Sequence, residues 1–92
     1  MQIRIERPSE EELKKINVYS WPIWTKEISK FDWYYDTDEF CLIIEGRVFV
    51  ETPDGNRVEI KAGDFVTFPK GLSCKWEIVE PIKKYYRMGS IS

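Results

Sequence analysis

Chemistry in this chain would have to come from carboxylates, thiols and aromatic side chains, because the sequence contains no histidine. Every histidine-based triad, zinc finger and three-histidine metal cage is therefore excluded. Glu39, Cys41 and Ile43 alternate along one stretch and would share one face of a strand. An inward Glu39 must be paired, hydrogen-bonded or neutralised, which makes it the best site candidate.

Glu39 has two interpretations. It could serve as a general acid or base, with Tyr35 as a second candidate catalytic residue, or it could anchor a ligand. It could equally be a structural carboxylate held by a tyrosine hydroxyl or by backbone amides. We expect Tyr35, Tyr85 or an amide to donate to it. We also expect Glu39→Gln to abolish ligand binding or turnover and to leave the stability within about 1 kcal/mol.

The two cysteines are far apart, and neither belongs to the CxxC pair that zinc ribbons and thioredoxin-like sites need. Cys74 could be a nucleophile, a soft-metal ligand or a packed thiol, and packing is favoured because no histidine could activate it. A metal held by Glu39, Cys74 and either Asp36 or Asp38 is a further alternative. Without imidazole, however, we expect no bound metal and no other cofactor.

Four tryptophans and five tyrosines are many for a chain of 92 residues. Some must anchor the core, because each ring buries a large area. Others would line a cavity mouth, where flat rings beside one carboxylate suit a sugar or another small ligand. The predicted ligand-binding residues are Trp33, Glu39, Cys41, Cys74, Trp76 and Tyr85.

The elements that must position these residues are one short helix and a series of strands. Residues 2–6 alternate like a strand, and Ser9 with Glu12 forms a capping box for a helix that ends near Asn17. From residue 20 onward the pattern has period two, with turns at 52–56, 61–64 and 69–71. Eight or nine short strands, two of them separated by Pro81, are typical of a β-sandwich or barrel.

The turn residues carry a resemblance to a known family. Glu39 and Gly46 have the spacing that closes the first cupin motif. The spacing of the second cupin motif is matched by Gly63, Pro69, Gly71 and Cys74. The segments 21–24, 31–35 and 66–71 resemble the small single-domain cupins related to ethanolamine-utilisation proteins, a group with a thermophilic bacterial branch.

This resemblance implies an all-β fold, a small cupin double-stranded β-helix or jelly-roll barrel, with one short N-terminal helix. It implies a single domain over 1–92, with its core at about 20–88 and the N-terminal strand and helix within 2–17. Metal-binding cupins use two histidines and a glutamate from the first motif and one histidine from the second. Only the glutamate remains here, as Glu39; the histidine positions fall on Trp33 and Tyr35, or Asp32 and Tyr34, and on Cys74.

We therefore expect a metal-independent cupin that binds a small carbohydrate-like or carboxylated metabolite in an aromatic-lined barrel. The alternative is a small isomerase or lyase in which Glu39 or a tyrosine, Tyr35 or Tyr85, moves a proton. One fold hosts many activities, so the resemblance does not choose between them.

Composition restricts the partners. Fourteen basic and sixteen acidic residues, with neither sign in a block, argue against nucleic acid or an anionic membrane as a partner. The lack of a signal peptide or long apolar run favours a cytoplasmic location, and abundant Lys and Glu with few amides is typical of thermophiles. We expect a homodimer, through sheet edges or the Trp21–Trp24 region beside Pro22.

Overall fold

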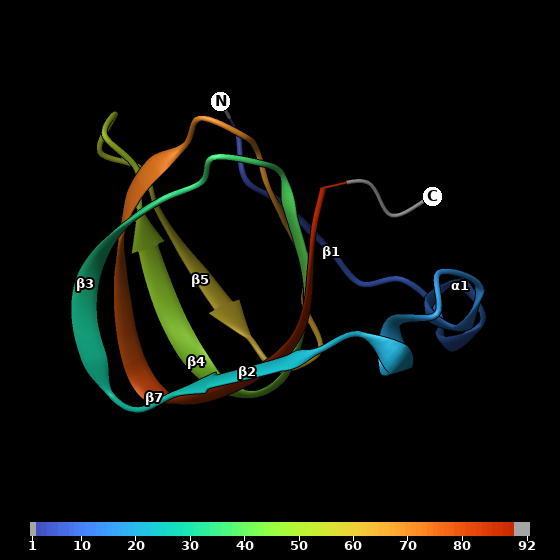
Figure 1. Ribbon diagram of the computed structural model, residues 1–92. Helices are drawn as coiled ribbons and strands as arrows, with labels where there is room; N and C mark the ends of the chain where they lie inside the picture. The colour runs from blue at the N-terminus through green and yellow to red at the C-terminus, as the bar shows by residue number, and fades with distance from the viewer. Residues whose placement is uncertain (1, 90–92) are drawn as a thin grey trace.

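The computed structural model describes residues 2–89, in which seven antiparallel strands form one sheet that curves into a barrel (Figure 1). In chain order the elements are β1 (Arg4–Glu6), α1 (Glu10–Lys15), a 3-10 turn (Val18–Ser20), β2 (Ile23–Lys26), β3 (Ser29–Tyr34), β4 (Glu39–Glu51), β5 (Arg57–Lys61), β6 (Phe65–Phe68) and β7 (Ser73–Met88). The main path through the sheet is β1-β6-β4-β7-β2, while β3 also pairs with β7 and β5 with β4. The predicted all-β cupin barrel with one short helix is confirmed.

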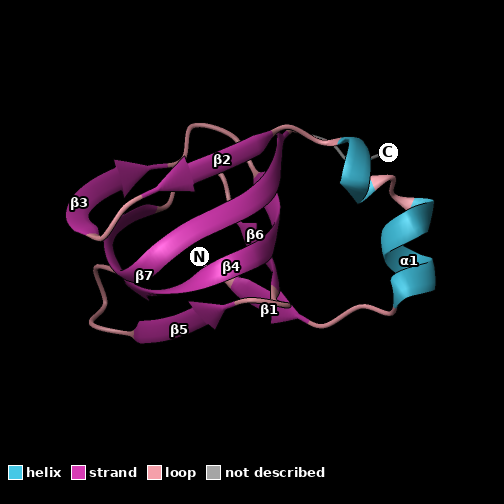
Figure 2. Ribbon diagram, turned by 90° about the horizontal axis from the view of Figure 1, so that it is seen from below, coloured by secondary structure: helices cyan, strands magenta, loops and turns pink. Residues whose placement is uncertain are grey.

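The helix α1 begins at the predicted capping box. The Ser9 hydroxyl accepts from the Glu12 backbone N–H at 3.2 Å, and the Glu12 carboxylate accepts from the Ser9 N–H at 3.0 Å. The helix ends before Asn17, whose φ of 58° is left-handed. Figure 2 shows α1 outside the barrel, at one end of it. No helix within residues 2–89 has the length and apolar character required to cross a membrane.

The expectation of eight or nine short strands is wrong, because β4 and β7 are single strands of 13 and 16 residues. They pass through Gly46 and Pro81, where their mutual register shifts. Gly46 has a φ of 97°, and a Cβ there would collide with the Pro81 carbonyl oxygen. The turn-forming residues therefore bend two paired strands together instead of ending them.

The register shift changes which residues of β4 face the barrel interior. Before Gly46 the inward positions are odd-numbered, as at Cys41 and Ile43, and after it they are even-numbered, as at Val48 and Val50. All four side chains are buried in the main core. The strand thus keeps one apolar face inside the barrel on both sides of its bend.

A second, smaller cluster covers part of the outer face of the sheet. Leu13 of α1 and Val18 of the following turn pack with Trp21, Leu42 and Phe65. Trp21 is only 6% exposed, so this ring is used within the protomer and is not available to a dimer interface. The helix therefore serves to cover the sheet.

Candidate functional site

The centre of the candidate site is a buried ion pair between neighbouring strands. The Lys84 ammonium on β7 donates to the Glu39 carboxylate on β4, with 2.5 Å between Nζ and Oε2. Both side chains are almost fully buried, with exposed fractions of 6% and 4%. Glu39 faces the interior as predicted, but its partner is a charged lysine and not the expected tyrosine or amide.

Lys84 is the residue of the candidate site that the sequence analysis missed. It belongs to the adjacent pair Lys83-Lys84, a pattern typical of a solvent-exposed face. Its signal lay in the alternation of the strand, because Ile82 is a core residue and Tyr86 packs against the core, and Lys84 stands between them with the same parity. Strand periodicity therefore places its side chain inside the barrel.

Aromatic rings surround the ammonium group. Lys84 Nζ lies 4.9 Å from the ring centroids of both Trp24 and Trp76 and 6.0 Å from that of Phe68. A desolvated cation over ring faces gains stabilisation from the negative face of each π system. The carboxylate and the rings together offset the free-energy cost of removing the Lys84 ammonium group from water.

A cavity of about 200 Å³ opens beside this ion pair. Its lining residues are Trp24, Phe31, Trp33, Tyr35, Glu39, Trp76, Lys84, Tyr86 and Met88. Phe31 stacks on Trp76 with 6.0 Å between centroids, and Trp33, which is 45% exposed, stands at the mouth. Among these lining residues only Glu39 and Lys84 carry charge, so the cavity is an apolar chamber with one ion pair.

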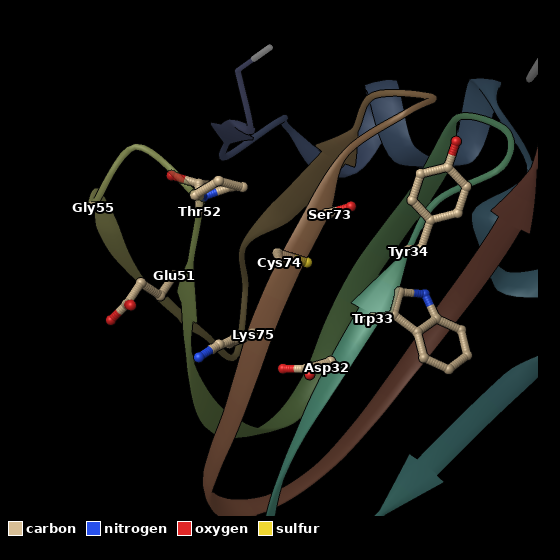
Figure 3. Close-up of a pocket in the computed structure, with 10 residues that line it drawn as sticks. Asp32, Trp33, Tyr34, Glu51, Thr52, Gly55, Ser73, Cys74 and Lys75 are labelled. Carbon is tan, nitrogen blue, oxygen red and sulfur yellow. The ribbon is translucent and has the colours of Figure 1, made fainter.

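A wider hollow of about 600 Å³ also has Trp33 in its lining (Figure 3). It is lined by Asp32, Trp33, Tyr34, Glu51, Thr52, Pro53, Gly55, Ser73, Cys74 and Lys75. In Figure 3 the rings of Trp33 and Tyr34 lie on one side of the start of β7, and Glu51 and Thr52 lie on the other. This hollow is more polar and more open than the small cavity, and it shares only Trp33 with it.

The predicted site residues are divided between these places. Trp33, Glu39 and Trp76 line the small cavity, as does the candidate catalytic residue Tyr35. Cys74 lines the wider hollow instead. The sequence therefore identified a group of side chains that the barrel brings together only in part.

Two predicted positions fall outside both hollows. Cys41 is fully buried, and its thiol donates to the Val66 carbonyl with 3.7 Å between sulfur and oxygen. Tyr85 lies on the opposite face of β7, where its ring packs edge-on against Tyr19 with 5.7 Å between centroids. The placement of Tyr85 in the cavity is wrong, because Lys84 occupies the inward position and alternation turns the next residue outward.

Burial keeps the Tyr35 hydroxyl and the two thiols near the ion pair uncharged. It raises the pKa of the Tyr35 hydroxyl, and the negative charge of Glu39 raises it further. Burial also raises the pKa of Cys41 to about 12 and that of Cys74 to about 11. Near neutral pH both thiols are therefore protonated and poor nucleophiles, and the Tyr35 hydroxyl keeps its proton and can donate or accept a hydrogen bond.

The residues present do not fit the metal of histidine-containing cupins. Trp33, Tyr35 and Cys74 stand at histidine positions in one alignment of the motif, and Glu39 contacts an ammonium group that would repel a cation. Within residues 2–89 no three carboxylate, thiol or imidazole side chains gather closely enough to hold a metal ion. The alternative metal site with Asp36 or Asp38 therefore does not form.

Comparisons with known proteins identify relatives. The model of the EutQ-like cupin domain matches residues 13–86. A crystal structure of a DUF861 family protein from Thermotoga maritima is 54% identical, with a TM-score of 0.93, over 95% of this chain and 99% of the other. No curated protein is detectably similar to the chain.

More distant solved structures share the fold. The EutQ protein of Clostridium difficile is 21% identical with a TM-score of 0.67, and the match covers 76% of this chain but only 55% of that protein. A cupin superfamily protein from Desulfitobacterium hafniense is 11% identical with a TM-score of 0.58, over 97% and 79% of the two chains. These findings confirm the resemblance that the turn motifs carried.

Proposed function

Because this chain belongs to the EutQ-like cupin family, we propose that it uses its barrel interior to bind a small carboxylated metabolite without a metal ion. The observation that carries this proposal is the contact of Lys84 with Glu39 at the wall of an aromatic cavity. An ammonium group has three N–H donors, of which Glu39 engages one. Lys84 can therefore offer a charge-assisted hydrogen bond to a ligand carboxylate.

The size of the cavity restricts this ligand. About 200 Å³ is less than the roughly 300–1,000 Å³ typical of pockets for drug-sized molecules. A carboxylate on a short carbon chain or a single small ring suits that volume and the surrounding rings. A carbohydrate-like ligand is favoured less, because a sugar needs many polar partners and the cavity is largely aromatic.

The second candidate is proton transfer, as in an isomerase or lyase. The observation that favours it is the buried Tyr35 hydroxyl, which finds no hydrogen-bond partner among residues 2–89 and lines the same cavity as Glu39 and Lys84. Glu39 would take a proton from the carbon next to a ligand carboxylate, and Lys84 would stabilise the resulting negative charge. Tyr35 would donate a hydrogen bond to the ligand carboxylate oxygen on which this charge develops.

Titration with formate, acetate and propionate tests the binding proposal. Trp24 and Trp76 lie against Lys84, so we expect their indole N–H signals in nuclear magnetic resonance spectra to shift on binding. Lys84→Met should abolish the shifts. Glu77→Gln, which alters an exposed ion pair with Arg57 on the outer wall, should leave them unchanged. Indole signals that stay constant at tens of millimolar of these carboxylates, and of carboxylates that also carry an amine, would refute the proposal.

A deuterium-exchange measurement separates the two candidates. If Glu39 abstracts a proton, the hydrogens next to the carboxylate of bound propionate should exchange with heavy water in the presence of the protein. Glu39→Gln should stop that exchange, because an amide is not a base. Binding without any exchange would leave a binding module and remove the enzyme alternative for this class of ligand.

A further inference from the structure

The charges that line the small cavity sum to zero, and this balance restricts the charge of a ligand that binds there. The Glu39 and Lys84 side chains are 4% and 6% exposed and form a pair with no net charge. No other residue that lines the cavity is charged. The neighbouring titratable groups, Tyr35, Cys41 and Cys74, are protonated near neutral pH and add no charge.

A ligand that brings only a carboxylate would upset this balance. One ammonium group would then serve two carboxylates, and the buried site would carry a net negative charge. An uncompensated charge in a low-dielectric interior is strongly unfavourable. The same argument applies with the opposite sign to a ligand that brings only an amine.

We propose that the ligand is a short zwitterion, a molecule in which an ammonium and a carboxylate group are separated by a few bonds. This proposal rests on the proposed function. The ligand carboxylate pairs with Lys84 and the ligand ammonium pairs with Glu39, so that the two protein charges exchange their mutual contact for contacts with the ligand. The cavity stays neutral before and after binding.

The aromatic wall supports the same ligand class. The faces of Trp24 and Trp76 already lie 4.9 Å from the Lys84 ammonium, which shows that these rings accept a cation at their surface. Phe31 and Trp33 extend the aromatic lining toward the mouth. A ligand ammonium beside Glu39 would therefore meet a second source of stabilisation from the rings.

The test compares matched pairs of ligands that differ by one ammonium group. The probes are acetate with glycine, propionate with β-alanine, and butyrate with 4-aminobutyrate. Affinity is measured from the indole signals of Trp24 and Trp76 and from the rise in melting temperature. At neutral pH we expect at least one zwitterion to bind about tenfold or more tightly than its matched carboxylate, which corresponds to about 1.4 kcal/mol.

Charge variants should reverse this preference. In Glu39→Gln the unpaired lysine should favour the simple carboxylates, and in Lys84→Met the unpaired glutamate should favour the matched amines ethylamine, propylamine and butylamine. The melting readout detects these preferences even in a destabilised variant, because a bound ligand stabilises the folded state. The neutral double variant should show no charge preference, and Glu77→Gln should keep the wild-type order.

The outcomes separate the two proposals. Simple carboxylates that bind the wild-type protein as tightly as their zwitterionic partners would overturn this inference and leave the proposed function standing. Failure of every probe to bind would overturn both. A variant that does not fold leaves the wild-type comparison, which decides the question alone.

Discussion

Replacing Lys84 with methionine should destabilise the protein more than replacing any lysine or arginine on its surface. Methionine keeps much of the apolar stem but leaves the Glu39 carboxylate, which is 4% exposed, without its charged partner. Removing one member of a buried ion pair costs about 3–5 kcal/mol. Uptake of a proton would relieve the charge, and protonating a glutamate in neutral water costs about 4 kcal/mol. We therefore expect a loss of about 3–4 kcal/mol.

The reverse substitution should cost less. Glu39→Gln leaves the Lys84 ammonium facing Trp24, Trp76 and Phe68, and cation–π contacts of about 0.5–2 kcal/mol each compensate part of the loss. We expect about 2–3 kcal/mol, in place of the loss of at most about 1 kcal/mol expected from the sequence. That expectation assumed an uncharged partner for Glu39.

The double variant completes the cycle. Glu39→Gln with Lys84→Met removes both charges, so that no unpaired charge is buried. The amide left without a partner costs about 1–3 kcal/mol, and we expect a loss in that range, well below the sum of the two single losses. Urea unfolding followed by tryptophan fluorescence measures all four proteins, and comparable m-values ensure that the same transition is compared.

The exposed pair of Arg57 and Glu77, with 2.6 Å between nitrogen and oxygen, provides the control. Exposed ion pairs contribute little, so Glu77→Gln should hardly change the free energy of unfolding. A loss in Lys84→Met no larger than that in Glu77→Gln would refute the reasoning. So would a double variant whose loss equals the sum of the two single losses.

Further predictions concern the bend, the thiols and the assembly. Gly46→Ala should lower the free energy of unfolding by about 2–3 kcal/mol or more, because strain at a positive φ adds to a collision with Pro81. Gly55 also has a positive φ but open space around it, so Gly55→Ala should lower it by about 1 kcal/mol in the same urea assay. Cys41 and Cys74 should resist a thiol reagent at about pH 8 until the protein is unfolded. The pKa values of these thiols are raised to about 12 and about 11, so above about pH 9 the folded state keeps protons that the unfolded chain releases. The stability should therefore fall as the pH rises above about 9. Thermal melting at several pH values measures this fall. We propose a homodimer through the edge strand β2, where Ile23 is 49% exposed; sedimentation at micromolar concentration should show twice the mass of one chain, and a monomer would contradict this.

Local signals were sufficient for much of the fold. The capping box at Ser9 and the inward face of Glu39 depend on residues close together in the chain, and both are found as predicted. The strand count was wrong because glycine and proline, found here at Gly46 and Pro81, are also the residue types that form turns. Whether such residues end a strand or bend it depends on the partner strand, which is distant in the sequence.

The candidate site could be predicted only in part for the same reason. Alternation along one strand identifies Glu39, and it would also have identified Lys84 in the segment from Ile82 to Met88. What alternation cannot supply is the pairing that brings them together, because Lys84 lies opposite Ile43 of β4, which is 41 positions away in the sequence. Their contact is a property of the sheet.

The bend at Gly46 divides β4 into two modules with different tasks. The first half supplies Glu39 to the small cavity as well as Cys41 and Ile43 to the apolar core, and the second half supplies Val48 and Val50 to the core alone. The inward positions are odd-numbered before the bend and even-numbered after it, so the two halves have independent alternation patterns. Substitution of the cavity residue before the glycine can therefore leave the alternation of the core residues after it unchanged.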